Sequence, residues 1–270
     1  MDAYLLCAGF GTRMRPLTDD TPKSLLPVGG RPLLDSLLAD LRGASSLETV
    51  HLVANHRTVE AFRAWAAEHR PALRDAGVSL RVYDDGVSTP DEQLGAVGDL
   101  RFLLERADPP PDGALVSGGD SLYRLPLAPL LDAFDGNTAQ VLALHEPDPD
   151  QRRQSSLLRL DGPRVLGVGG DDETASLRIC PSWYLLPRSA LSAVGPYLEA
   201  GGDPDTLGTF IDALARRRRV EAVKLPERPD LRLHCNTPED LERARTLLDE
   251  EPCLLLDAET VRRCLPAPDA

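Results

Sequence analysis

A run of glycines and two basic residues near the N-terminus are the strongest sign of chemistry in the sequence. Residues 5–28 read LLCAGFGTRMRPLTDDTPKSLLPV and contain Arg13 and Lys23. Glycines allow successive backbone N–H groups to turn toward one point, and such a nest binds anions, phosphates above all. Arg13 adds a forked donor that suits phosphate oxygens, and Lys23 adds a compact point charge. The segment therefore predicts a phosphate-binding loop.

Lysine is rare in this chain, which gives Lys23 additional weight. Only two of the 30 basic residues are lysines, Lys23 and Lys224. A lysine kept against this background indicates a position where arginine does not serve. Two common phosphate-binding loops are excluded, because the segment has no Walker A pattern and Met14 stands where the dinucleotide fingerprint has its third glycine.

A second candidate site residue, Asp120, follows a short apolar run and two glycines. Open α/β sheets bind ligands at the carboxyl ends of their strands. A carboxylate at such a place suits Mg²⁺, which keeps several waters and bridges substrate phosphates. The alternative is an aspartate that only turns the chain, because the sequence GGDS is typical of turns. We expect Asp120 to hold Mg²⁺.

The first segment resembles the signature of sugar-1-phosphate nucleotidylyltransferases, LxAGxGTR[LM]xPLTxxxPKxLxPV, at every fixed position. The resemblance implies a Rossmann-like domain that transfers a nucleoside monophosphate from a triphosphate to a phosphorylated acceptor and releases pyrophosphate. It implies catalytic roles for Arg13, on the β- and γ-phosphates and the leaving pyrophosphate, and for Lys23, on the α-phosphate. The loop residues that would cradle the nucleotide are Ala8, Gly9, Phe10, Gly11 and Thr12.

Residues 94–100, LGAVGDL, are similar to the family segment LGTAGAL, in which a helix begins near the base and ribose. By this resemblance Gly95 lies close to the base, and Gln93 is a donor and acceptor for the base edge. Ala96, Val97 and Asp99 depart from the family pattern. The segment at Asp120 is likewise similar to the family's strand followed by Gly-Asp, which implies an Mg²⁺ cofactor.

Residues 233–241, LHCNTPEDL, resemble the family pattern WxD[IVT][GN]TPEDL, in which the aspartate is a second metal ligand. His234 stands at that position, and Mg²⁺ prefers oxygen ligands. Three arrangements remain open: His234 acts through a water, Asn236 supplies an oxygen, or Asp120 holds the ion with the triphosphate alone. A weakened catalyst is a further alternative.

The acceptor half matches the family less well. Residues 169–173, GGDDE, replace a family segment that carries the lysine for the acceptor phosphate. Arg178, or the pair Arg152 and Arg153, is the candidate replacement. We expect a sugar-1-phosphate or a similar acceptor and thus NDP-sugar synthesis. The alternatives are a cytidylyltransferase for a phosphocholine-like or phosphonate acceptor, and a degenerate relative that binds nucleotide and regulates a partner.

Short apolar runs alternate with amphipathic segments, which predicts an α/β fold. We expect a three-layer α/β/α arrangement with a central, mostly parallel mixed sheet and a β-rich, acceptor-binding insertion. The nucleotidyltransferase domain is expected over residues 1–250, followed by a C-terminal tail. Within it we expect a nucleotide half over about 1–135, an acceptor half over about 136–235 and a closing helix over 237–250.

The composition excludes several function classes. The chain has 270 residues, with 30 basic against 43 acidic ones and a net charge of −13, which argues against binding to nucleic acid or anionic membranes. The five cysteines are never spaced CxxC, which fits a reducing compartment. The sequence shows no signal peptide and no long apolar run. We therefore expect a cytoplasmic enzyme whose partners are an NTP and a phosphorylated small molecule, and a homo-oligomer is compatible with this.

Overall fold

The computed structural model describes residues 1–107, 110–153, 155–169, 177–250 and 253–266. A ten-stranded mixed sheet runs through the molecule in the order β11-β9-β10-β13-β8-β12-β6-β1-β4-β5. One half of it is parallel, and its inner strands are apolar almost throughout because helices cover both faces. The strands of this half are β1 (Asp2–Leu6), β4 (Thr49–Ala54), β5 (Ser79–Asp84) and β6 (Ala114–Gly118).

The other half of the sheet is largely antiparallel. Among the described strands of this half, only β8 and β13 run parallel to each other. The prediction of a mostly parallel sheet therefore holds for the nucleotide half alone, because short hairpins such as the one at Gly162 favour antiparallel neighbours. The strands of this half are β8 (Ala139–His145), β9 (Ser156–Asp161), β10 (Arg164–Val168), β11 (Arg178–Cys180), β12 (Trp183–Leu186) and β13 (Val220–Lys224).

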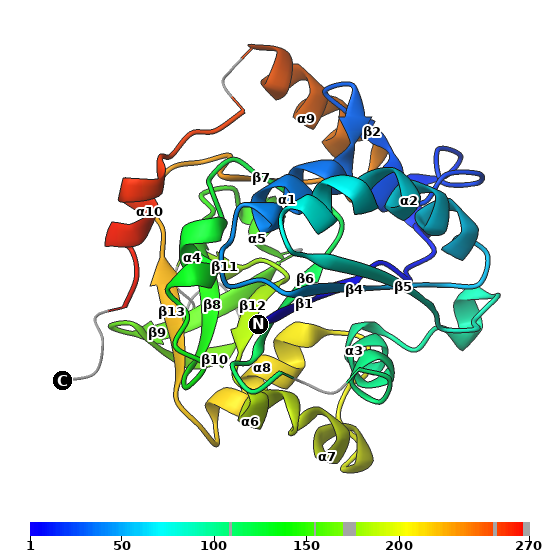
Figure 1. Ribbon diagram of the computed structural model, residues 1–270. Coiled ribbons are helices and arrows are strands. Elements are labelled where there is room, and N and C mark those ends of the chain that lie inside the picture. The colour runs from blue at the N-terminus through cyan, green and yellow to red at the C-terminus, as the bar shows by residue number, and fades with distance from the viewer. Residues whose placement is uncertain (108–109, 154, 170–176, 251–252, 267–270) are drawn as a thin grey trace.

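The β-rich segment expected as an insertion extends the main sheet, since β9, β10 and β11 continue it beyond β13. Helices cover both faces, so the three layers expected from the sequence are present (Figure 1). The helices on one face are α1 (Leu33–Arg42), α2 (Val59–Asp75), α4 (Ala128–Asp132) and α10 (Ala258–Arg263). Those on the other are α3 (Ala96–Leu104), α6 (Arg188–Leu191), α7 (Val194–Glu199) and α8 (Leu207–Ala215).

The remaining elements surround the end of the sheet where β1 and β6 finish. Helix α9 begins at Pro238, one residue later than the closing helix expected over 237–250. The side chain of Thr237 accepts from the N–H of Asp240 at 3.1 Å, and the Asp240 carboxylate accepts from the N–H of Thr237 at 3.0 Å. The elements are α5 (Pro149–Arg153), α9 (Pro238–Glu250), the short helices η1 (Thr12–Met14), η2 (Lys23–Leu25) and η3 (Pro90–Glu92), and the paired strands β2 (Pro27–Val28) with β3 (Arg31–Pro32) and β7 (Ser121–Tyr123) with β14 (Arg232–His234).

The predicted C-terminal tail contains α10, which packs on the main body beside α4. Val261 of this helix is fully buried in the core cluster that also holds Leu130 and Leu131. The described part of the tail is therefore integrated with the fold.

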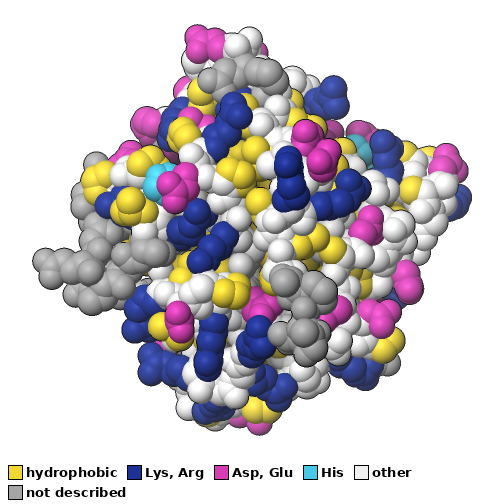
Figure 2. Space-filling model, turned by 90° about the vertical axis from the view of Figure 1, so that its left-hand side faces the viewer, with side chains coloured by type: hydrophobic (Ala, Val, Ile, Leu, Met, Phe, Trp, Pro, Cys, Tyr) yellow, Lys and Arg dark blue, Asp and Glu magenta, His cyan; other side chains and the backbone are white. Residues whose placement is uncertain are grey.

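The surface mixes charges of both signs. Figure 2 shows a face on which basic side chains lie in small groups among acidic and hydrophobic ones. Among the described residues, the structure has no helix with the length and apolar character needed to cross a bilayer.

Candidate active site

A cleft of about 630 Å³ opens at the carboxyl ends of β1 and β6, where open α/β sheets place their ligands. It brings together nearly every site residue that the sequence singled out. The predicted residues that line it are Ala8, Gly9, Phe10, Gly11, Thr12, Arg13, Lys23, Gln93, Gly95, Asp120, His234 and Asn236.

The glycine-rich loop is held from beneath by β4 and the residue after it. The N–H of Cys7 donates to the carbonyl oxygen of Val53 at 3.0 Å, and Asn55 Nδ2 donates to the carbonyl oxygen of Ala8 at 2.8 Å. Asn55 is fully buried, and the sequence reasoning missed it. The feature of the sequence that could have indicated Asn55 is its place as a polar residue directly after a buried strand. A Cβ built on Gly9 would meet nothing within 4 Å, so the body of the protein does not require this glycine.

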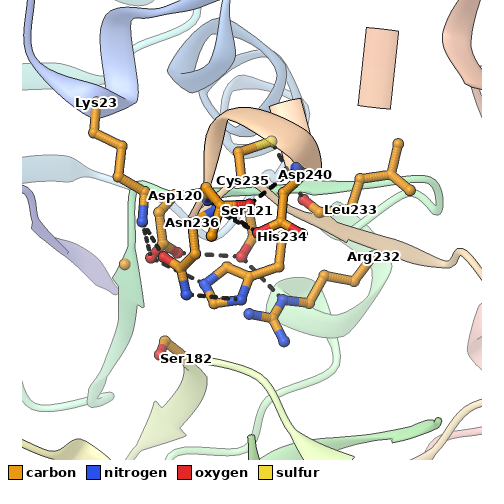
Figure 3. A network of polar contacts seen from close by, with 12 residues as sticks. Lys23, Asp120, Ser121, Ser182, Arg232, Leu233, His234, Cys235, Asn236 and Asp240 are labelled. Atoms are coloured by element: carbon orange, nitrogen blue, oxygen red, sulfur yellow. Dashed lines mark hydrogen bonds and ion pairs between the residues drawn. The ribbon is translucent and has the colours of Figure 1, made fainter. Parts of the chain in front are cut away.

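A ring of polar contacts joins four side chains from distant parts of the sequence (Figure 3). Lys23 Nζ, on η2, donates to Asp120 Oδ2 at 2.9 Å and also to Asn236 Oδ1. His234 Nε2 lies 3.2 Å from the same Asp120 oxygen, and Asn236 Nδ2 lies 3.1 Å from His234 Nδ1. The turn after β6 supplies Asp120, and β14 and the residues after it supply the other two.

The ring fixes the proton position on His234. Because Lys23 donates to Asn236 Oδ1, the other amide atom of Asn236 is the donor Nδ2. His234 Nδ1 therefore accepts, and Nε2–H donates to Asp120. Burial lowers the pKa of His234 more than the nearby Asp120 raises it, which agrees with a neutral ring. In this arrangement His234 holds Asp120 by a hydrogen bond and offers no lone pair to a metal ion.

Burial would raise the pKa of Asp120, but Lys23 and His234 outweigh it and hold that pKa well below its usual range. The carboxylate is therefore charged at neutral pH. Burial also raises the pKa of Cys7 and of Cys235 to about 12. Both thiols are neutral, which excludes them as thiolate nucleophiles.

The oxygen-bearing side chains of the site fit an Mg²⁺ ion that is held mainly by substrate phosphates and water. Asp120 is the carboxylate beside the phosphate loop, and Asn236 Oδ1 is a second oxygen next to it. No group of three His, Cys, Asp or Glu side chains with a metal-binding arrangement occurs in the part of the chain that the structure describes. Mg²⁺ needs no such group, since one or two carboxylates with phosphates and waters suffice.

Arg232 is a cation near the ring that the sequence reasoning missed. Its Nε donates to Ser121 Oγ at 3.0 Å, and Ser121 Oγ donates to Asp120 Oδ1 at 3.2 Å. Figure 3 shows its guanidinium group beside His234, on the side where Ser182 lies. Residues two apart on a strand share a face, so its spacing from His234 was a usable signal.

The arginines proposed for the acceptor phosphate lie elsewhere and are engaged with backbone. Arg178 donates to the carbonyl oxygens of Ala143 and Leu225 at 2.9 and 2.7 Å. Arg152 donates to the carbonyl oxygen of Pro147 at 2.7 Å. Neither is among the described residues that line the cleft, and the side chain of Arg153 lies outside the described part.

The sequence matches the MobA-like NTP transferase domain over residues 3–220. This span covers most of the chain, so the protein belongs to the MobA-like NTP transferase family. The family prediction drawn from the first motif is thereby confirmed.

Two relatives share parts of the sequence. Mannose-1-phosphate guanylyltransferase of Mycobacterium tuberculosis is 31% identical over 177 residues, which are 64% of this chain and 41% of that protein. The bifunctional protein GlmU of Methanococcus aeolicus is 43% identical over 56 residues, 21% of this chain and 13% of that protein. The chain thus spans less than half the length of these relatives.

Two solved structures share the fold along nearly the whole chain. A UDP-glucose pyrophosphorylase complexed with UDP-glucose has a TM-score of 0.71 at 15% identity and covers 92% of this chain and 98% of its own. The inositol-1-phosphate CTP transferase from T. maritima has a TM-score of 0.68 at 18% identity and covers 92% and 95%. At these identities the likeness establishes the nucleotidyltransferase fold.

Proposed function

We propose that this protein transfers a nucleoside monophosphate from a nucleoside triphosphate to a sugar-1-phosphate or a similar phosphorylated acceptor, with release of pyrophosphate. One observation carries the proposal: the glycine-rich loop, Arg13, Lys23 and Asp120 line a single cleft. Backbone N–H groups and two cations suit a triphosphate. The family of the chain supports the same class of reaction.

The reaction is an in-line displacement at the α-phosphorus. An oxygen of the acceptor phosphate forms the new bond to that phosphorus, the bond to the bridging oxygen breaks, and its electron pair leaves with pyrophosphate. An acceptor phosphate has a second pKa of about 6 and is largely dianionic at pH 7, so it needs no general base. Catalysis then consists of positioning and of neutralising charge.

The residues of the cleft divide this work. Arg13 binds the β- and γ-phosphates and stabilises the leaving pyrophosphate, and the N–H groups of residues 8–12 cradle the chain of phosphates. Lys23 stabilises the charge on the α-phosphate, for which it exchanges its present contact with Asp120. Gln93 and Gly95 line the part of the cleft that we assign to the base.

Asp120 would hold Mg²⁺, with Asn236 Oδ1 as a second oxygen. When bound, Mg²⁺ supplies neutralisation of phosphate charge. His234 keeps the Asp120 carboxylate in place by donating its Nε2 proton. This role explains how the site tolerates a histidine at the position where the family has an acidic residue.

Residues 136–235 supply the acceptor side in this proposal, and residues 1–135 the nucleotide side. We assign the acceptor phosphate to Arg232, which lies outside the cleft in an adjoining pocket that shares His234 with it, and whose guanidinium lies beside the ring that contains Lys23 and Asp120 (Figure 3). A planar fork suits bidentate contact with a phosphate. Arg178 and Arg152, two of the three arginines favoured by the sequence, are less suited, since backbone carbonyls already occupy them.

Pyrophosphate release across a panel of five NTPs and several acceptors tests the proposal. Turnover with a sugar-1-phosphate is the expected result. Turnover only with CTP and phosphocholine or a phosphonate would replace it by the cytidylyltransferase alternative. Binding of an NTP without turnover on any acceptor would favour the regulatory alternative, to which the His234 contact lends some support.

A further inference from the structure

A buried carboxyl group in the wall of the cleft takes no part in the mechanism above. Asp99 lies in the first turn of α3, where its N–H donates to the carbonyl oxygen of Gly95 at 2.7 Å. The residue belongs to the wall of the cleft and is only 6% exposed. Its Oδ1 is buried without a hydrogen-bond partner among the described residues.

An unpaired buried carboxyl group is costly for the fold. Native proteins pair nearly all buried polar atoms, and an exception calls for an explanation such as a missing ligand. Burial, with a smaller contribution from Asp85, raises the pKa of Asp99 to about 7. A hydrogen-bond donor brought by a ligand would repay this cost.

Charge decides which part of a nucleotide reaches Asp99. Arg13 and Lys23 are the only lysine or arginine side chains among the described residues that line the cleft. The α3 wall instead carries Asp85, Asp99 and Asp205. Like charges repel, so the triphosphate lies at the cationic end and the base or ribose lies against α3.

The hydrogen-bonding pattern of the bases narrows the choice further. An ionised carboxylate only accepts, and its two oxygens match two donors that lie side by side. Guanine presents such a pair on one edge, N1–H and the N2 amino group. Adenine and cytosine present one donor beside an acceptor, and uracil and thymine present one N–H between two carbonyls. In this structure Asp99 Oδ1 is turned into the wall, and the broad torsion of an aspartate carboxyl lets both oxygens turn toward such a pair when the base binds.

Building on the proposed function, we infer that Asp99 binds the N1–H and N2 amino group of guanine, and that the preferred nucleotide is GTP. Asp99 is then a specificity-determining residue rather than a catalytic one. Asp99 occupies a position at which the sequence departs from the family segment LGTAGAL. The alanine of that segment has no side-chain acceptor for the donors of the base. The loop next to the phosphates keeps its role for any base.

Calorimetric titration of the full chain with GTP, ITP and ATP, each with Mg²⁺, tests this inference. ITP lacks the N2 amino group, so the wild-type protein should bind GTP about ten- to a hundredfold more tightly than ITP, the worth of one hydrogen bond to a charged group. Asp99→Ala should bring the GTP-to-ITP ratio close to one and leave the affinity for ATP within about threefold. Asp40→Asn is the matched control, since burial raises the pKa of Asp40 to about 7 as well but Asp40 does not line the cleft.

The outcomes separate this inference from the proposed function. Failure of every NTP to bind the wild-type protein would refute the proposed function itself. Binding of NTPs with equal affinity for GTP and ITP, or a ratio that Asp99→Ala leaves unchanged, would overturn the guanine assignment alone. A GTP-to-dGTP ratio that falls in Asp99→Ala, with the GTP-to-ITP ratio unchanged, would assign Asp99 to the ribose and equally overturn it.

Discussion

At the scale of single residues, the site depends on one lysine that serves two partners. Without substrate, Lys23 neutralises Asp120 and fixes Asn236. A phosphate group that enters the cleft competes with Asp120 for the same ammonium group. A compact, rotatable charge can make this exchange, whereas the rigid fork of arginine cannot occupy both places equally well.

Replacement of Lys23 by alanine should therefore lower kcat by about 10²–10³, the loss typical of one removed charge-stabilising donor. Lys23→Arg should fail to restore the rate. Steady-state pyrophosphate release measures both variants. Lys224→Ala is the control, because Lys224 is the other lysine of the chain and is exposed at the end of β13. An unchanged kcat in Lys23→Ala would refute the assigned role.

His234 gives a second prediction at this scale. His234→Asp replaces a neutral donor by a second carboxylate next to Asp120, so a divalent cation should bind at least about tenfold more tightly. Titration with Mn²⁺, followed by electron paramagnetic resonance without nucleotide, measures this. His234→Asn adds no charge and should leave the affinity near that of the wild-type protein. Equal affinities in all three proteins would contradict the proposal that His234 occupies the position of a second metal ligand.

At the scale of elements, Gly95 and Gly9 of the nucleotide site are glycines for different physical reasons. Gly95 precedes α3 with φ at +76°, and a Cβ there would lie 2.4 Å from the carbonyl oxygen of Pro204. That same oxygen accepts from the N–H of Val97 at 2.8 Å and so caps the helix. Gly9 has open space around its missing Cβ, which leaves ligand approach as its physical reason.

Paired alanine variants separate these two roles. Gly9→Ala should leave the thermal midpoint unchanged within about 1–2 °C and weaken NTP binding about tenfold or more, because the new methyl group occupies space for phosphate. Gly95→Ala should lower the free energy of unfolding by about 2 kcal/mol or more through strain and the clash with Pro204. Thermal melts with and without NTP measure both. Loss of fold in Gly9→Ala, or a fully stable Gly95→Ala, would reverse this account.

The same scale shows how far the sequence alone could lead. The place of the glycine-rich loop in the cleft was predictable because its residues form one contiguous segment, and that of Asp120 because it follows directly after a buried strand. Arg232 and Asn55 act through partners that the chain brings together from far apart, Ser121 and Ala8. The direction of the strands in the acceptor half could not be predicted from the sequence either, because pairing between distant segments determines it. Asp99 departed visibly from the family pattern, but only its burial without a partner gave that departure a meaning.

At the scale of the whole molecule, a net charge of −13 does not prevent the binding of anionic substrates. Surface charges more than about 8 Å away are largely screened at physiological salt. A cation about 4 Å from a phosphate contributes on the order of 4 kcal/mol at an effective dielectric near 20. At the phosphate end of the cleft, Arg13 and Lys23 therefore outweigh the distant surface charge.

Global stability should carry a signature of Asp99. Its pKa rises from 3.8 to about 7 on folding, so the folded state binds more protons than the unfolded state between these values, and stability falls as pH rises through this window. Asp99→Asn removes this penalty. The variant should gain about 2–3 kcal/mol relative to the wild-type protein between pH 5 and pH 8.

Chemical denaturation of both proteins at the two pH values measures the difference. Other titrating groups act equally in both proteins and cancel. Asp40→Asn should show a similar gain because burial raises the pKa of Asp40 to about 7 as well, but only Asp99→Asn should also lose the preference for GTP. If the buried Asp99 carboxylate serves ligand binding, its replacement should make the protein more stable and less selective at the same time. An Asp99→Asn variant with the same pH dependence as the wild-type protein would mean that Asp99 is already paired within the fold.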